Sequence, residues 1–162
     1  MTLLAGVDLS VSRLDVAIIP LDPDTPRDPV FVTEHVPQAT DKSQRCRQIG
    51  RIIPLMLRDY DQDVTMVWVE EPYGPYRTAD RALLPVYGAV LASIPAWMEA
   101  TGITTREWRS VLGLPLGLSK TQAILEAHSR CPDLERTLDE HEAEAVLVAL
   151  AGRAECERGA IG

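Results

Sequence analysis

Two short apolar runs, each ending at a carboxylate, constrain the fold of this chain more than any other feature. Leu3–Val7 is followed at once by Asp8, and the β-branched run Val64–Val69 is followed by Glu70. Runs of this length and composition predict buried β-strands. Strands without a polar face need helices on both sides of their sheet, which is the arrangement of α/β proteins.

The rest of the chain supplies further strands and the helices. β-prone residues predict a second strand at Leu14–Pro20, in a hairpin with the first, and a third at Val30–Val36. Helical spacing and capping motifs predict helices over Thr40–Tyr60, Thr78–Ser93, Thr104–Leu112, Ser119–Ser129 and Asp139–Ala151, with a short last strand at Trp97–Ala100. Pro54 should kink or shorten its helix. We therefore predict an α/β domain at 1–155, with a mixed five-stranded sheet flanked by helices, and a C-terminal tail at 156–162.

Composition narrows the class of protein. With 162 residues, of which 46% are hydrophobic, the chain can form one domain with a substantial core. No apolar run approaches the roughly 20 residues that cross a membrane, and the N-terminus lacks a signal-peptide pattern, so we expect a soluble intracellular protein. The three cysteines form no C-x-x-C pair, which gives no support for a zinc site. The net charge of −8 argues against nucleic-acid binding, which needs Lys or Arg for phosphate contacts.

Four side chains are the candidates for a metal site. His141 and Glu144 are three residues apart and share one face of the last helix, and they join Asp8 and Glu70 if the two apolar strands are neighbours. Each has an ordinary structural explanation when taken alone, such as a solvated strand end or a helix-dipole contact. Together their charges call for a cation, and hard oxygen ligands suit Mg²⁺ or Mn²⁺. Two such ions about 4 Å apart would promote phosphodiester hydrolysis.

These motifs resemble those of a known family. Gly6-Val7-Asp8, Val69-Glu70 and His141-x-x-Glu144-Ala look like the RuvC family of Holliday junction resolvases, within the RNase H-like superfamily. Glu107-Trp108-Arg109 and Ser119-Lys120 resemble the family's stretch before its DNA-facing helix. The resemblance implies an RNase H-like fold and a homodimer whose two sites each nick one strand of a four-way DNA junction. It also implies a cytoplasmic protein of a bacterium, or of a bacterial cell infected by a virus.

The resemblance gives each residue a role. Asp8 would bridge two Mg²⁺ or Mn²⁺ ions, Glu70 and Glu144 would each bind one, and His141 would ligate the second ion or move protons. Lys120 would contact the scissile or an adjacent phosphate. The sequence departs from the family in two places, because Leu9-Ser10-Val11-Ser12 replaces a glycine-containing turn and Glu144 replaces the usual aspartate.

The DNA contacts and the dimer interface are predicted less directly. Tyr73 matches an aromatic that probes the junction bases, or it covers the sheet edge. We expect a basic face that binds DNA. It comprises Arg13, Arg77, Arg81, Arg106, Arg109 and Lys120, although each of these residues, taken alone, could simply be a solvated surface residue. Leu83–Leu91 is either the dimer seam or part of the core. Two other functions stay open: an RNase H-like nuclease for flaps, forks or RNA, and a non-catalytic nucleic-acid-binding module.

Overall fold

The computed structural model describes residues 1–10, 12–25, 28–35, 41–60, 63–72, 78–132 and 134–160, with side chains for all except 42, 43, 78–81 and 160. Its sheet has the strand order β3-β2-β1-β4-β5. The strands are β1 (Leu3–Leu9), β2 (Arg13–Pro20), β3 (Val30–His35), β4 (Val64–Glu71) and β5 (Glu99–Thr104). The first three pair antiparallel, whereas β4 runs parallel to β1 and to β5. The predicted mixed sheet of five strands is confirmed.

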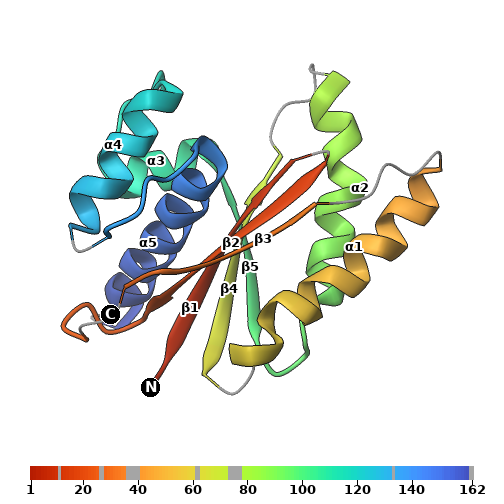
Figure 1. Cartoon of the computed structure of the whole chain (residues 1–162), viewed down its shortest axis with the longest axis horizontal. Coiled ribbons are helices and arrows are strands. Elements are labelled where there is room, and N and C mark those ends of the chain that lie inside the picture. The colour runs from red at the N-terminus through yellow and green to blue at the C-terminus, as the bar shows by residue number, and fades with distance from the viewer. Residues whose placement is uncertain are drawn as a thin grey trace.

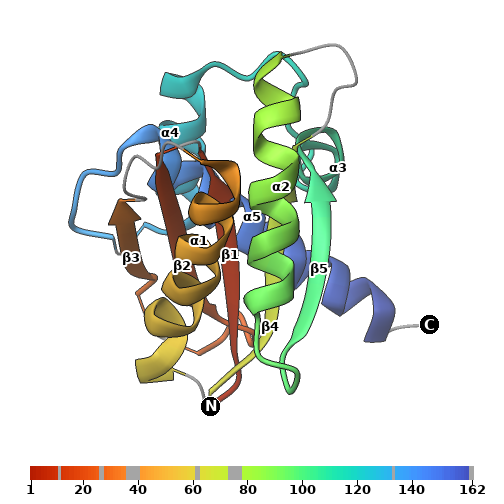
Figure 2. The same ribbon diagram turned by 90° about the vertical axis from the view of Figure 1, so that its right-hand side faces the viewer.

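Helices cover both faces of this sheet (Figure 1). They are α1 (Lys42–Leu57), α2 (Thr78–Ser93), α3 (Thr105–Val111), α4 (Lys120–Arg130) and α5 (Glu140–Ala160), with a 3₁₀ turn at Arg58–Tyr60. The pair α1 and α2 lies across one face, as Figure 2 shows from that side, while α5 covers the other face together with α3 and α4. Each face has its own buried apolar cluster. The sheet is therefore the middle layer of three.

Strand β1 packs directly against α5. Its side chains alternate, so that Leu3, Ala5 and Val7 belong to the cluster under α1 and α2, while Leu4, Gly6 and Asp8 face α5. A Cβ atom at Gly6 would lie only 2.4 Å from the backbone oxygen of Ala145 in α5. This close approach needs glycine, and it holds the start of α5 beside the carboxyl end of β1.

The capping motifs read from the sequence begin three helices as predicted. Thr104 with Glu107 and Ser119 with Gln122 form reciprocal capping boxes at the starts of α3 and α4. At α5, Asp139 Oδ1 accepts hydrogen bonds from the backbone nitrogens of His141 and Glu142, both at 3.0 Å. Glu142 in turn accepts from the backbone nitrogen of Asp139. The start of α5 is therefore fixed by its own side chains.

Some predicted boundaries differ from the structure. The last strand was predicted at Trp97–Ala100 but spans Glu99–Thr104, because its parallel pairing with β4 decides its position and Trp97 is 70% exposed. The first helix continues past Pro54 as far as Leu57. Helix α5 continues to Ala160, into the segment expected to be a tail. No helix among the described residues combines the length and apolar character needed to cross a bilayer.

Candidate active site

The candidate acids lie at one end of the sheet. β1 and β4 are adjacent and parallel, and Val7 pairs with Val69, so Asp8 and Glu70 follow at the same carboxyl edge. Both project toward α5, because Glu70 continues the alternation of Met66 and Trp68, which pack under that helix. The first turns of α5 carry His141 and Glu144 to the same edge. Residues far apart in sequence are thereby brought together.

A cleft of about 330 Å³ opens at this edge. It is lined by Asp8, Leu9, Glu70, Glu71, Pro72, Leu83, Thr105, Arg109, His141 and Glu144. All four predicted metal ligands are in this set. One ligand atom from each of Asp8, His141 and Glu144 lies within 4.8 Å of the others, which is close enough to share one cation. Glu70 lies outside this closest trio but lines the same cleft.

Asp8 and His141 form the central contact of the cleft. His141 Nδ1 lies 2.7 Å from Asp8 Oδ2. The Asp8 side chain is 4% exposed. Burial raises the pKa of Asp8 to about 8, although the hydrogen bond with His141 opposes the shift. The same hydrogen bond raises the pKa of His141 to about 9. The pair therefore holds a proton at neutral pH.

Glu144 also has an unusual affinity for protons. Its pKa rises to about 6, first through burial and then through the nearby charge of Glu70. Glu70 and Glu144 likewise raise the pKa of Asp8. Three carboxyl groups beside an imidazole, two of them with a raised pKa, form a donor set that a divalent cation would stabilise. Oxygen-rich ligands with one imidazole fit Mg²⁺ or Mn²⁺.

Helix α3 holds Glu70 in place through two contacts that were not predicted from the sequence. Thr105 donates a hydrogen bond of 2.5 Å to Glu70 Oε1, and the indole nitrogen of Trp108 donates to the same oxygen at 3.2 Å. Trp108 is fully buried. Both contacts use the same oxygen of Glu70. The sequence feature that could have indicated these contacts was Trp108 within a short capped helix, since a buried indole N–H usually has a polar partner.

Arg109 also lines the cleft. Its guanidinium lies over the Trp108 ring, 5.1 Å from the ring centre, and it donates to the backbone oxygen of Leu116. Its buried Nε has no hydrogen-bond partner among the described residues. Arg109 is therefore anchored beside the acids, and its positive charge suits an anionic group in the cleft.

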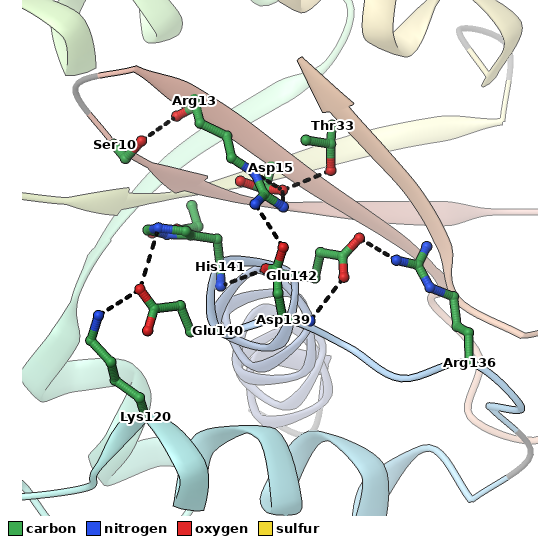
Figure 3. A network of polar contacts seen from close by, with 11 residues as sticks. Ser10, Arg13, Asp15, Thr33, Lys120, Arg136, Asp139, Glu140, His141 and Glu142 are labelled. Carbon is green, nitrogen blue, oxygen red and sulfur yellow. Dashed lines mark hydrogen bonds and ion pairs between the residues drawn. The ribbon is translucent and has the colours of Figure 1, made fainter. Parts of the chain in front are cut away.

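Lys120 lies outside the cleft lining, and its side chain is 75% exposed. Its ammonium lies 2.5 Å from Glu140 Oε1, and the same oxygen lies 3.6 Å from His141 Nε2 (Figure 3). Glu140 is thus an ion-pair partner of Lys120, because the first residue of α4 lies beside the first residue of α5. This contact connects Lys120 to the acid cluster through Glu140.

The remaining predicted DNA-binding residues have different surroundings. Arg13 is only 19% exposed and is paired with two carboxylates. Arg106 is exposed on α3. Arg81 lies in α2, but its side chain is outside the described part, and Tyr73 and Arg77 fall within 73–77, which is also outside it.

No family model matches the sequence, and no curated protein is similar to it in sequence. Solved structures with the same fold as this chain are known, however. RuvC from Thermus thermophilus superposes with a TM-score of 0.76 at 17% identity, covering 98% of this chain and 97% of that one. The T. thermophilus RuvC structure in complex with Holliday junction substrate gives a TM-score of 0.74 at 16% identity, with the same coverage. The chain therefore has the RuvC fold, and the predicted RNase H-like architecture is confirmed.

Proposed function

We propose that this protein is a metal-dependent endonuclease that resolves Holliday junctions or related branched DNA. The observation that carries the proposal is the cleft in which Asp8, Glu70, His141 and Glu144 meet beside Arg109. The fold adds support, since T. thermophilus RuvC, which shares it, has been solved with a Holliday junction substrate. The three carboxyl groups and the imidazole suit cation binding, and the arginine suits a phosphate.

The acids would hold two Mg²⁺ or Mn²⁺ ions. Asp8 would contribute to both positions, with Glu70 at one and Glu144 and His141 at the other, in line with the close grouping of the last two with Asp8. Such ions supply charge stabilisation for the attacking and leaving oxygens of a phosphodiester displacement. Thr105 and Trp108 keep the Glu70 carboxylate in one orientation, which lowers the cost of ordering it when a ligand binds.

The Asp8–His141 pair would hold a proton before a cation binds and release it when one does. Without a cation, the proton that they hold reduces the repulsion among the three carboxyl groups. Binding of a cation requires ionised Asp8 and Glu144, so protons must leave the cleft. His141 is 30% exposed, and its Nε2 points away from Asp8, so it is placed to pass protons between the cleft and solvent.

Substrate binding would rest on few cations, because the chain carries a net charge of −8. Arg109 would bind a phosphate inside the cleft, and Arg77, Arg81, Arg106 and Lys120 would act around it. Tyr73 would stack on bases at the junction. Cations bound by the acids would reduce the local negative charge. We therefore expect DNA binding that depends on both metal and salt.

A homodimer would present two such sites to the two strands of a four-way junction. Helix α2 is the candidate interface, since Leu84 is 50% exposed while Val86 and Val90 of the same helix are buried in the core. Leu83 lines the cleft. The dimer seam would therefore lie beside the site. Such a protein would act in the cytoplasm of a bacterium or of a virus-infected bacterial cell.

The direct test is cleavage of a synthetic four-way junction in Mg²⁺ or Mn²⁺, with products sized on a denaturing gel. Wild-type protein should produce paired nicks, and Asp8→Asn should produce none while keeping its fold by circular dichroism. Asp59→Asn, at a surface position with a side chain 73% exposed, is the matched control and should cut normally. Cleavage by Asp8→Asn at the wild-type rate would refute the assignment.

The substrate class needs a separate comparison. Flaps, replication forks, RNA–DNA hybrids and four-way junctions should be offered to one protein preparation under identical metal and salt conditions. Preferred cutting of the four-way junction supports the resolvase proposal. Preferred cutting of flaps, forks or RNA would identify a different nuclease of this fold, and binding without cutting in either metal would identify a non-catalytic module.

A further inference from the structure

A buried aspartate lies next to the cleft without lining it. Asp15 on β2 pairs with Asp8 on β1, so both side chains project from the α5 face of the sheet. Asp15 is 1% exposed. Its Oδ1 accepts hydrogen bonds from Arg13 Nε at 3.0 Å, Arg13 Nη2 at 2.6 Å and Thr33 at 2.7 Å (Figure 3). A carboxylate this buried needs its cationic partner.

Arg13 also reaches the first turn of α5. Its third nitrogen, Nη1, lies 2.6 Å from Asp139 Oδ2. The other oxygen of Asp139 accepts the backbone N–H groups of His141 and Glu142. The guanidinium therefore ties strand β2 to the residue that caps α5. All three of its nitrogens are used, and its side chain is 19% exposed.

These contacts form a continuous ring of interactions that begins and ends at Asp8. Asp8 pairs with Asp15 across two strands, Asp15 binds Arg13, and Arg13 binds Asp139. Asp139 caps the turn that carries His141, and His141 Nδ1 returns to Asp8 at 2.7 Å. The distance between the Asp8 and His141 side chains is therefore set by the arginine as well as by the packing of α5 on the sheet.

We propose that Arg13 is a positioning residue that, held between Asp15 and Asp139, sets the separation of Asp8 and His141 for cation binding and does not contact DNA phosphate. The proposal rests on the proposed metal-dependent function and gives a residue expected at the DNA surface a different role. The planar fork of arginine matters here, because a lysine ammonium is a single point charge and would not reproduce all three contacts. Loss of a group that orients metal ligands typically weakens metal binding by about 10–100-fold.

The test measures Mn²⁺ binding by calorimetry without DNA. Arg13→Lys keeps the charge that Asp15 needs. Asp139→Asn keeps a helix cap of similar quality but loses the ion pair, and its side chain is 46% exposed, which favours folding. Both variants should bind Mn²⁺ about tenfold or more weakly than wild type. Arg136→Gln is the matched control and should bind Mn²⁺ normally. Arg136 pairs with Glu142 at the same helix start and lies over the Phe31 ring of β3, but in the described part of the chain it forms no hydrogen bond or ion pair with Asp15 or Asp139.

A second measurement separates the positioning role from DNA contact. At saturating Mn²⁺, and with the fold of the variant verified by circular dichroism, the slope of junction affinity against salt concentration should be the same for Arg13→Gln and wild type. A slope reduced by about one, together with unchanged Mn²⁺ affinity in Arg13→Lys, would show a phosphate contact and overturn the proposal. Equal loss of Mn²⁺ affinity in Arg136→Gln would also overturn it, since any loosening of the helix start would then suffice. If wild-type protein binds no Mn²⁺, the proposed function itself fails.

Discussion

Replacing Gly6 with alanine should damage the fold and the metal site together. The added Cβ would lie 2.4 Å from both Ala145 O and Ala149 N, and 2.8 Å from Ala149 Cα. Ordinary contact begins at 3.4 Å, so α5 and β1 must separate by about 1 Å, the difference between 3.4 and 2.4 Å. All three close neighbours are backbone atoms and cannot rotate away. Overpacking of this kind typically costs about 1–3 kcal/mol of unfolding free energy.

The same displacement should reach the chemistry, since β1 carries Asp8 and α5 carries His141, now 2.7 Å apart. A shift of about 1 Å in a catalytic group can lower the rate by about 100-fold. Urea unfolding would measure the stability, and Mn²⁺ calorimetry and junction cleavage would measure the site. The matched control is Gly152→Ala, whose Cβ would lie 2.5 Å from the Trp68 ring, toward the other end of α5. That variant should lose stability but keep Mn²⁺ affinity, and wild-type stability and metal affinity in Gly6→Ala would refute the reasoning.

Three other variants or conditions test separate parts of the site. Thr105→Val removes a hydrogen bond to Glu70 and should weaken Mn²⁺ binding, measured by calorimetry, by about tenfold or more. Thr101→Val, in the middle of β5, is the control and should bind Mn²⁺ like wild type. Equal Mn²⁺ affinities for Thr105→Val and wild type would contradict the role given to Thr105. Arg109→Gln should raise the KM for junction DNA and reduce the salt slope by about one in filter binding, and an unchanged slope would remove Arg109 from the phosphate contacts. Mn²⁺ affinity should rise between about pH 6, the pKa of Glu144, and about pH 9, the pKa of His141, because the cation competes with the protons on these groups. Calorimetry in buffers of different ionisation enthalpy should show that protons are released when Mn²⁺ binds. An affinity that does not change with pH would contradict this prediction.

The sequence predicted those features of the fold that depend on local pattern. Apolar runs marked β1 and β4, and serine, threonine or aspartate followed by a glutamate or glutamine marked the starts of α3, α4 and α5. The acids were predictable because a carboxylate at the end of an apolar strand is costly unless it has a purpose or a partner. These signals lie within a few residues of one another along the chain.

Features that depend on pairing between distant segments were missed. β5 was misplaced because its position comes from its pairing with β4, in which Glu70 pairs with Ile103. Its β-branched residues are separated by Gly102 and preceded by Glu99 and Ala100, which weakens the local strand pattern. The contacts of Thr105 with Glu70 and of Arg13 with Asp139 join residues from different elements. An arginine in the sequence reads equally as a surface cation or as a buried ion-pair partner, and only the fold separates the two.

The central claim is that the cleft binds divalent cations through side chains from β1, β4 and α5. Crystals of the wild-type protein soaked in Mn²⁺ would test it through the anomalous signal of manganese. We predict two peaks about 4 Å apart, with Asp8 contacting both, Glu70 beside one, and Glu144 with His141 beside the other. A map with no peak in the cleft at saturating Mn²⁺, or with manganese bound only elsewhere on the surface, would contradict the account.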